Sequence, residues 1–296
     1  MATYRVPSAL STPPAALSAR TGSCTFVQAA VAACLAQILP NAADLARGST
    51  GPEHVHQLRV GLRRLRTVLR EMVELNADLD PGWEAPLADV FRALGAQRDR
   101  DVLAGPTAAA LAAAGSPFTP QPPRQPAGPS PGELVHSEAF QRTLLALIAF
   151  TTHPAPTPAF DGSPVTALRD RLDRLHRRLV KDTKRFATMS TAQQHRMRKR
   201  LKRFRYLAEF AAPLFRPKRA KRYLAALKPA QDCLGARNDE ATALALLRDL
   251  AQAEPRAWFA VGWLTARQAA SVPAAKQVLK QAAKARPFWR GKPAPR

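Results

Sequence analysis

The stretch HQLRVGLRRLRTVL at residues 56–69 returns later in the chain as HRMRKRLKRFRYLA at residues 195–208. At an offset of 139, histidine aligns with histidine, and basic and apolar residues then follow in the same order. At an offset of 140, LGAQRDRD at residues 94–101 aligns with LGARNDEA at residues 234–241. Two matched blocks at nearly one offset predict an internal duplication.

Each matched stretch predicts an amphipathic helix with one basic and one apolar face, because a helix turns about 100° per residue. The basic face of the first helix carries His56, Arg59, Arg63, Arg66 and Arg70, and its apolar face carries Leu58, Leu62, Leu65, Leu69 and Met72. The second helix repeats both faces, with His195, Arg198, Lys202 and Arg205 on one and Met197, Leu201, Phe204 and Ala208 on the other. It departs from the pattern at Glu209, which stands in the position of Arg70.

A row of like charges along one helix is destabilising unless an anion binds there. Arginine suits that task because its planar guanidinium bonds phosphate oxygens in pairs and stays charged. For a single helix, a solvated face would be the simpler interpretation, but the same spacing in both halves favours an anion site. The neighbouring cations of the two helices join the candidate ligands: Arg64, Lys199 and Arg203.

The whole chain of 296 residues is strongly basic, with 45 Lys and Arg against 22 Asp and Glu, a formal net charge of +23. Such a charge attracts phosphates, nucleic acids and acidic membrane surfaces. The excess is concentrated in residues 165–230, which hold 21 basic and four acidic residues. This window adds five further candidate ligands, three on one helical stripe and two in a compact cluster: Arg174, Arg178 and Lys181, and Arg219 and Arg222.

The chain as a whole is predicted to be all-α, because sustained strand-like alternation is absent and Ala, Leu and Arg dominate. We expect helices at residues 24–39, 53–76, 84–113, 134–151, 164–187, 191–215, 218–252 and 256–286. The proline-rich stretch 116–132 predicts a loop, and a second break covers 152–164. These helices predict two pseudo-symmetric four-helix bundles, 23–152 and 164–290, between a disordered tail at 1–22 and a short one at 291–296.

The remaining conspicuous residues favour structural roles. The three cysteines suit a reducing cytoplasm, and the apolar stretch 25–39 is short enough to be a core helix rather than a membrane span. No histidine has a second His or Cys at ligand spacing, so neither a metal nor a cofactor is expected. In the second pair of matched blocks, Gly95 and Gly235 would permit close helix approach or a local kink, and Asp99 and Asp239 would orient arginines rather than act as catalytic bases.

These residues together resemble the CHAD domain, the conserved histidine α-helical domain. The resemblance covers residues 23–290 and rests on the two His–Arg helices, the paired LGxxxD elements and the closing ARPFW at 285–289. It implies two four-helix bundles with a basic channel between them, which bind inorganic polyphosphate and are linked to polyphosphate or polyester storage granules. By position it places the ligand role on His56, Arg59, Arg63, Arg66, His195, Arg198, Lys202 and Arg205. The ExExK motif of the CYTH domain, which is fused to many relatives, is absent from the sequence.

The leading hypothesis is therefore non-enzymatic binding of inorganic polyphosphate in the cytoplasm, with storage granules and their proteins as expected surroundings. A nucleic-acid binder is the alternative, although no helix-turn-helix, zinc-finger or aromatic RNP pattern is present and only non-specific binding is expected. An accessory subunit of a phosphate-chain-processing enzyme is a second alternative. Catalysis by this chain itself finds no support, because a Gly-rich phosphate loop and an acidic metal cluster are both missing.

Overall fold

The structure, a computed structural model, describes residues 17, 21–49, 51–121, 128–153, 163–291 and 293. The side chains of residues 96–101 also lie outside the description, while their backbone is helical. Most of the tail expected at 1–22, the middle of the proline-rich loop, most of the 152–164 break and most of the tail at 291–296 fall outside the described residues.

The described chain is predominantly helical, in agreement with the all-α prediction, and its extended pairing is limited to one bridge between Phe215 and Pro293. Short 3-10 turns extend or join several of the helices. The helices are α1 Ser23–Ala46, α2 Pro52–Glu71, α3 Glu84–Val102, α4 Ala108–Ala113, α5 Pro131–His136, α6 Glu138–Thr152, α7 Pro164–Arg185, α8 Thr191–Ala211, α9 Pro217–Leu250, α10 Ala257–Ala270 and α11 Val272–Lys284.

Several predicted boundaries were wrong. Helix α1 continues through Pro40 to Ala46, because its apolar face beyond the proline still packs on the core. The helix expected over 84–113 is interrupted by a π-helical segment, Leu103–Thr107, which contains Gly105 and Pro106. The helix expected over 256–286 divides at Ser271 into α10 and α11.

The helix expected over 134–151 begins earlier, because Ser130 forms a capping box with Glu133 and Pro131 takes the first helical position. It then breaks at Ser137, which separates α5 from α6. The loop before α5 was predicted to cover residues 116–132. It begins after α4, as predicted, but α5 already starts at Pro131, inside the predicted loop.

The predicted apolar faces of the two matched helices, α2 and α8, are confirmed, because all their members are buried, and α7 buries an apolar face of the same kind. Close packing behind α2 depends on Gly61, where a Cβ would lie 2.7 Å from the Ile38 side chain of α1. The buried set is Leu58, Leu62, Leu65 and Leu69 in α2, with Met72 directly after it; Val165, Leu168, Leu172, Leu175 and Leu179 in α7; and Met197, Leu201, Phe204 and Ala208 in α8.

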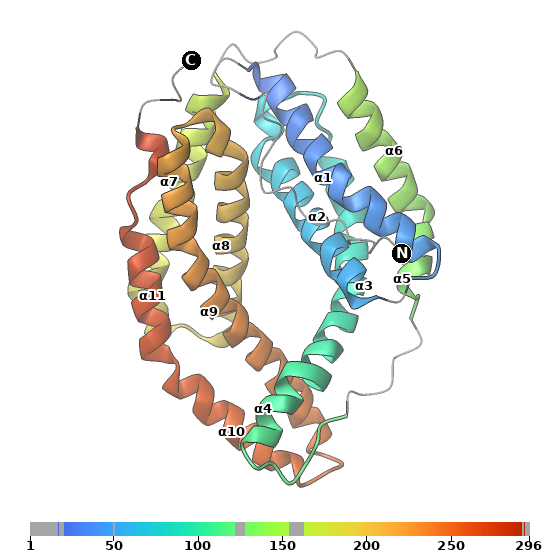
Figure 1. Ribbon diagram of the computed structural model, residues 1–296, viewed down its shortest axis with the longest axis vertical. Coiled ribbons are helices and arrows are strands. Elements are labelled where there is room, and N and C mark those ends of the chain that lie inside the picture. The colour runs from blue at the N-terminus through green and yellow to red at the C-terminus, as the bar shows by residue number, and fades with distance from the viewer. Residues whose placement is uncertain are drawn as a thin grey trace, which may run out of the picture.

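The helices stand in two groups, with α1–α3, α5 and α6 on one side and α7–α9 and α11 on the other (Figure 1). The groups meet along α2 and α8, the helices that carry the two matched sequences, and α3 packs against α9. One buried cluster of side chains runs through both groups. A second cluster joins Leu103 and Leu111 to α9 and α10, where α4 and α10 meet at one end of the molecule (Figure 1).

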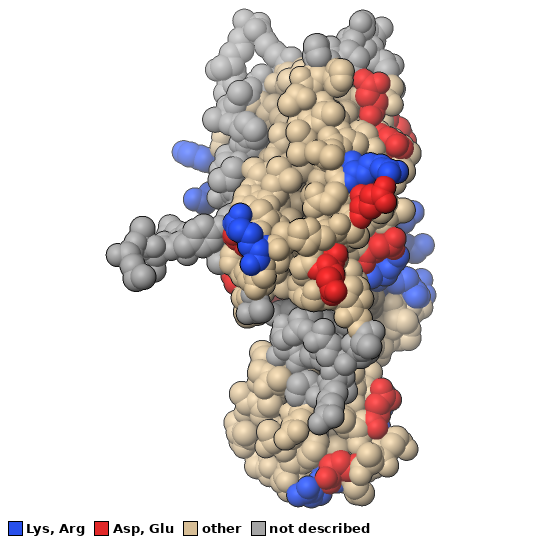
Figure 2. Space-filling view, turned by 90° about the vertical axis from the view of Figure 1, so that its right-hand side faces the viewer, with Lys and Arg blue, Asp and Glu red and all other residues tan. Residues whose placement is uncertain are grey.

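Within the described residues, α1 is the helix long and apolar enough by composition to cross a membrane. Its Phe26, Val27, Val31 and Ile38 side chains are fully buried against the rest of the protein, so it serves as a core helix, as predicted. On the outer side of this half, near α5 and α6, charges of both signs are scattered among uncharged residues (Figure 2). The basic excess is therefore not gathered on that face.

The closing ARPFW motif fills the core of the second half. Trp289 is fully buried, and its indole Nε1 donates to Asp173 Oδ1 at 2.8 Å. Beside it, buried His176 shares a hydrogen bond with the Tyr223 hydroxyl at 2.9 Å, and burial lowers the pKa of its imidazole. This histidine is therefore part of the core.

Candidate functional site

The crossing of α2 and α8 brings cations from the two matched helices together around Lys202. Burial lowers the pKa of its ammonium to about 6, and the positive charges of Arg63, Arg198 and Arg59 act in the same direction. Only the carboxylate of Asp239, from α9, acts against them among these neighbours. Such a gathering of basic side chains from two helices attracts a polyanion. We call Arg59, Arg63, Arg198 and Lys202 the central cluster.

Two of these cations are held in place by α3. The Arg59 Nη1 donates to the Phe91 carbonyl oxygen at 2.6 Å, and its guanidinium lies 4.3 Å from the centre of the Phe91 ring. The Arg63 guanidinium lies 5.1 Å from the same ring. At Gly95, a Cβ would come within 3.1 Å of Arg59 Nη1, so this glycine leaves room for the arginine. The uncharged Phe91 ring thus contacts the guanidinium groups of Arg59 and Arg63 without adding a negative charge.

The α8 side of the cluster is held by α9. The Arg198 Nη2 lies 4.0 Å from Asp239 Oδ1, and the Asn238 Oδ1 accepts a hydrogen bond from His195 Nδ1. This geometry fits the orienting role expected for Asp239, whereas the Asp99 side chain lies outside the described residues. Close helix approach at Gly235 is not observed, because a Cβ there would meet nothing within 4 Å.

Towards the C-terminal ends of the two helices, carboxylates neutralise the predicted basic faces. Arg66 and Arg70 both pair with Glu84, at 2.8 and 2.5 Å. Arg205 lies 2.8 Å from Glu209 through Nε and donates to Gln231 through Nη1. These ion pairs lie towards the C-terminal ends of the two stripes, whereas the central cluster lies near the middle of each helix.

Arg64 and Arg203 lie at the interface between the two halves rather than on the basic faces. Arg64 is buried, and its Nη1 donates to Glu209 Oε2 at 2.8 Å. Arg203 Nε lies 3.0 Å from Glu71 Oε1. The prediction grouped them with the ligands because they adjoin Arg63 and Lys202 in sequence, but one residue turns the helix by about 100°.

The other candidate ligands are not among the charges that act on Lys202. Arg174, Arg178 and Lys181 are exposed on α7, and Lys199 is exposed on α8. Arg219 and Arg222 are exposed at the start of α9, and Arg222 lies roughly 25 Å along that helix from Asp239, at about 1.5 Å per residue. His56 is half-buried on α2.

Three residues of the site, Phe91, Glu84 and Asn238, were not predicted from the sequence. Asn238 lies inside the matched LGARNDEA block, so its presence in the site could have been suspected. Phe91 and Glu84 precede the corresponding block in the first half, and nothing in their spacing distinguishes them from core or surface residues.

A ligand set for a metal ion is not observed, because no cluster of three His, Cys, Asp or Glu side chains occurs among the residues that the structure describes.

The family model described as the CHAD domain matches residues 29–248 of the chain. The chain belongs to the CHAD domain family. This family is linked to polyphosphate. The match ends inside α9, so α10 and α11 lie beyond the matched range, while both helices of the central cluster lie within it.

Two solved structures are similar to this CHAD protein. The crystal structure of the CHAD domain from the plant Ricinus communis is 29% identical, with a TM-score of 0.76, and the match covers 99% of each chain. The structure of PptA from Streptomyces chartreusis has a TM-score of 0.61 at 19% identity, with 88% of this chain and 99% of that chain covered. At that identity the second likeness concerns the fold alone. Comparison with curated proteins finds no match.

Proposed function

We propose that this CHAD protein binds inorganic polyphosphate without covalent chemistry at the central cluster. The observation that carries the proposal is the convergence of three arginines, Arg59, Arg63 and Arg198, on Lys202 where α2 and α8 cross. A polyanion bound there would meet basic side chains from both matched helices, and counterions released from its chain would add to the affinity. The link between the family and polyphosphate supports the same ligand.

Polyphosphate fits this position better than a nucleic acid does. Three members of the cluster, Arg59, Arg63 and Lys202, are half-buried between α2, α3 and α8. A thin chain with charge on every unit can lie against half-buried cations of this kind. A duplex presents its phosphates on a broad cylinder with grooves of about 6 to 12 Å. The exposed cations on α7 and at the start of α9 would bind DNA weakly and without sequence preference.

The test is a pair of titrations at physiological salt, one with long-chain polyphosphate and one with duplex DNA at equal total charge. We expect polyphosphate to bind far more tightly, with a steep dependence on salt concentration. Equal affinities would instead favour the nucleic-acid alternative, because they would mean that net charge alone attracts the ligand.

The proposed location follows the proposed ligand. We propose that the protein resides in the cytoplasm and gathers on polyphosphate or polyester storage granules. A fluorescent fusion that loses its granular distribution when Arg59 and Arg63 are replaced by Ala would support this. A distribution that is unchanged in that variant would speak against it.

A further inference from the structure

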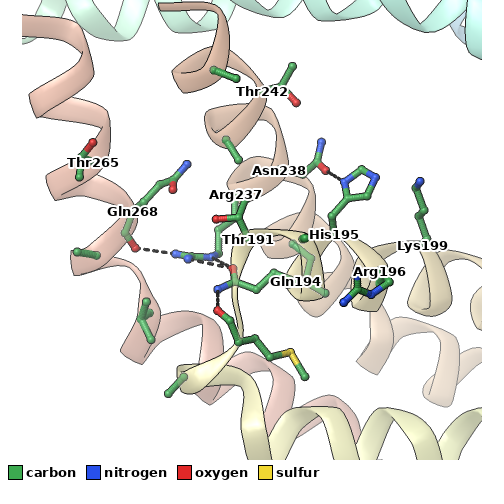
Figure 3. A pocket seen from close by; sticks show the side chains of 18 residues that line it. Thr191, Gln194, His195, Arg196, Lys199, Arg237, Asn238, Thr242, Thr265 and Gln268 are labelled. Atoms are coloured by element: carbon green, nitrogen blue, oxygen red, sulfur yellow. Dashed lines mark hydrogen bonds between the residues drawn. The ribbon is translucent and has the colours of Figure 1, made fainter. Parts of the chain in front are cut away.

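A pocket of about 970 Å³ lies beside the central cluster, between the start of α8, the middle of α9 and the junction of α10 with α11. Pockets of about 300 to 1,000 Å³ suit an organic molecule of moderate size. Its ionisable lining residues are all basic: His195, Arg196, Lys199 and Arg237. Figure 3 shows Arg196 and Lys199 on the α8 side and Thr265 and Gln268 on the opposite, α10 side.

The pocket continues the basic face of α8. At about 100° per residue, His195 and Lys199 point to the same side of the helix as Arg198 and Lys202. His195 also hydrogen-bonds Asn238, the neighbour of Asp239 in α9. A ligand with phosphates on the central cluster could therefore extend along α8 into the pocket without crossing an acidic side chain among the lining residues.

Arg237 belongs to the wall of the pocket. Its Nη1 donates to the Gln268 carbonyl oxygen at 2.8 Å, and its Nη2 donates to Gln194 Oε1 at 3.1 Å (Figure 3). It thereby ties the end of α10 to the start of α8. The cations left for a ligand are the exposed Arg196 and Lys199, which flank the α8 side.

The other walls do not suit a bare phosphate chain. Small apolar side chains line them, among them Ala241, Ala245, Ala269 and Val272, and a chain whose every unit is charged gains nothing there. The amide Nε2 of Gln268 is buried and has no hydrogen-bond partner among the described residues. A buried donor of this kind favours a ligand that carries an acceptor.

We propose that the pocket holds the uncharged ring system of a nucleoside polyphosphate whose phosphates lie on the basic face of α8. Apolar alanines would contact the faces of the rings, and the amide of Gln268 would donate to a ring acceptor. A lipid chain fits less well, because the threonines Thr191, Thr242 and Thr265 interrupt the apolar lining. The inference rests on the proposed function for the phosphate part and extends it to a class of organic phosphates.

Isothermal titration of the full chain with ATP and with inorganic tripolyphosphate tests this. Both ligands carry three phosphates, but in ATP one of them is esterified, so tripolyphosphate has the larger charge and should bind at least as tightly on charge alone. We expect ATP to bind roughly ten-fold more tightly, which requires contacts beyond the phosphates. ATP binding no tighter than tripolyphosphate overturns the proposal.

A pocket-filling variant separates this inference from the proposed function. Ala245→Phe should bring the affinity for ATP down to that for tripolyphosphate and leave binding of long-chain polyphosphate unchanged. Ala236→Phe is the matched control, since Ala236 is exposed on the same helix and does not line the pocket. Unchanged ATP binding in Ala245→Phe overturns the pocket as the site. If polyphosphate and tripolyphosphate fail to bind the wild type while ATP binding remains sensitive to Ala245→Phe, the proposed function fails and the pocket stands.

Discussion

Arg64 of α2 and Glu209 of α8 form an ion pair across the interface between the two halves, with 2.8 Å between Nη1 and Oε2. The Arg64 guanidinium also lies 4.9 Å from the centre of the Phe210 ring. A reciprocal pair joins Arg203 of α8 to Glu71 of α2 at 3.0 Å. Each helix thus supplies one arginine and one glutamate to its partner, which fixes how α2 and α8 cross and hence where the central cluster forms.

Replacing Glu209 with Ala should destabilise the protein by about 3 kcal/mol, because it leaves the buried Arg64 without its carboxylate. The Arg64 side chain is only 8% exposed, so solvent cannot replace the lost partner. Chemical denaturation followed by circular dichroism measures the change. Polyphosphate affinity should fall as well, since the crossing of α2 and α8 is no longer fixed.

A matched control is available in α6. Glu138 pairs with Arg142, and both side chains are exposed, at 83% and 79%. Exposed pairs contribute about 0 to 1 kcal/mol, so Glu138→Ala should leave stability nearly unchanged. If the two glutamate variants lose the same stability, the interface pair has no special part in holding the halves together.

The central cluster predicts the effect of removing its two sides separately. Arg59→Ala with Arg63→Ala, and Arg198→Ala with Lys202→Ala, should each weaken polyphosphate binding by orders of magnitude, because a charged hydrogen bond contributes roughly 1.5 to 3 kcal/mol. The salt dependence should flatten in both variants, since fewer counterions are released. Filter binding at several salt concentrations gives both quantities.

The control for this pair is Arg92→Ala with Arg142→Ala, which removes the same charge from exposed positions on α3 and α6. We expect it to lower affinity only slightly at physiological salt, where distant charges are screened. A loss comparable to that of the central variants would show that the ligand senses net charge rather than the cluster.

The fold could be predicted from periodicity because each helix buries one continuous apolar face. The faces of α2 and α8 were predicted residue by residue, since side chains such as Leu58 and Leu201 recur at helical spacing and are buried in the core. Interruptions inside the helical segments were harder to predict. Pro40 lies within a helix while Pro106 lies in a π-helical segment, and the packing around each, not the residue itself, decides which occurs.

The site was predicted in part, because spacing shows which cations share a face but not which of them find a carboxylate. Arg63 and Arg66 lie on one predicted face, yet only Arg66 has Glu84 within reach. Glu71 and Glu209 pair with arginines more than 130 residues away in the chain, a relationship that no local pattern reveals. Glu209, which departs from the basic pattern, forms such a long-range pair with Arg64.

Purified protein should release no phosphate from polyphosphate, with or without magnesium, because no metal-binding carboxylate cluster occurs among the described residues.

Asp239→Asn should instead change binding. Removing the carboxylate near Arg198 raises the positive potential, so affinity for polyphosphate should increase a few-fold. A malachite-green assay and a titration measure the two effects. Turnover that disappears in Asp239→Asn would show that this carboxylate acts in catalysis.

The lowered pKa of Lys202, about 6, predicts that binding takes up a proton. Near pH 7.5 the free site holds Lys202 mostly as the neutral amine. A bound polyanion favours the ammonium, so about one proton is taken up per site and affinity falls as pH rises above about 6. The same shift affects folding: between pH 6 and about 10.4 the unfolded chain binds this proton and the folded chain does not. Lys202 therefore makes stability rise with pH across that window.

Lys202→Arg separates this effect from the histidines. A guanidinium stays charged throughout the range, so the variant should bind polyphosphate at pH 7.5 at least as tightly as the wild type, without proton uptake. Titrations in two buffers of different ionisation enthalpy measure the uptake directly. If Lys202→Arg still takes up a proton and the His56→Gln, His195→Gln double variant does not, the histidines carry the pH dependence. In that case Lys202 is already a charged ammonium in the free protein, and the lowered pKa of Lys202 does not describe the central cluster.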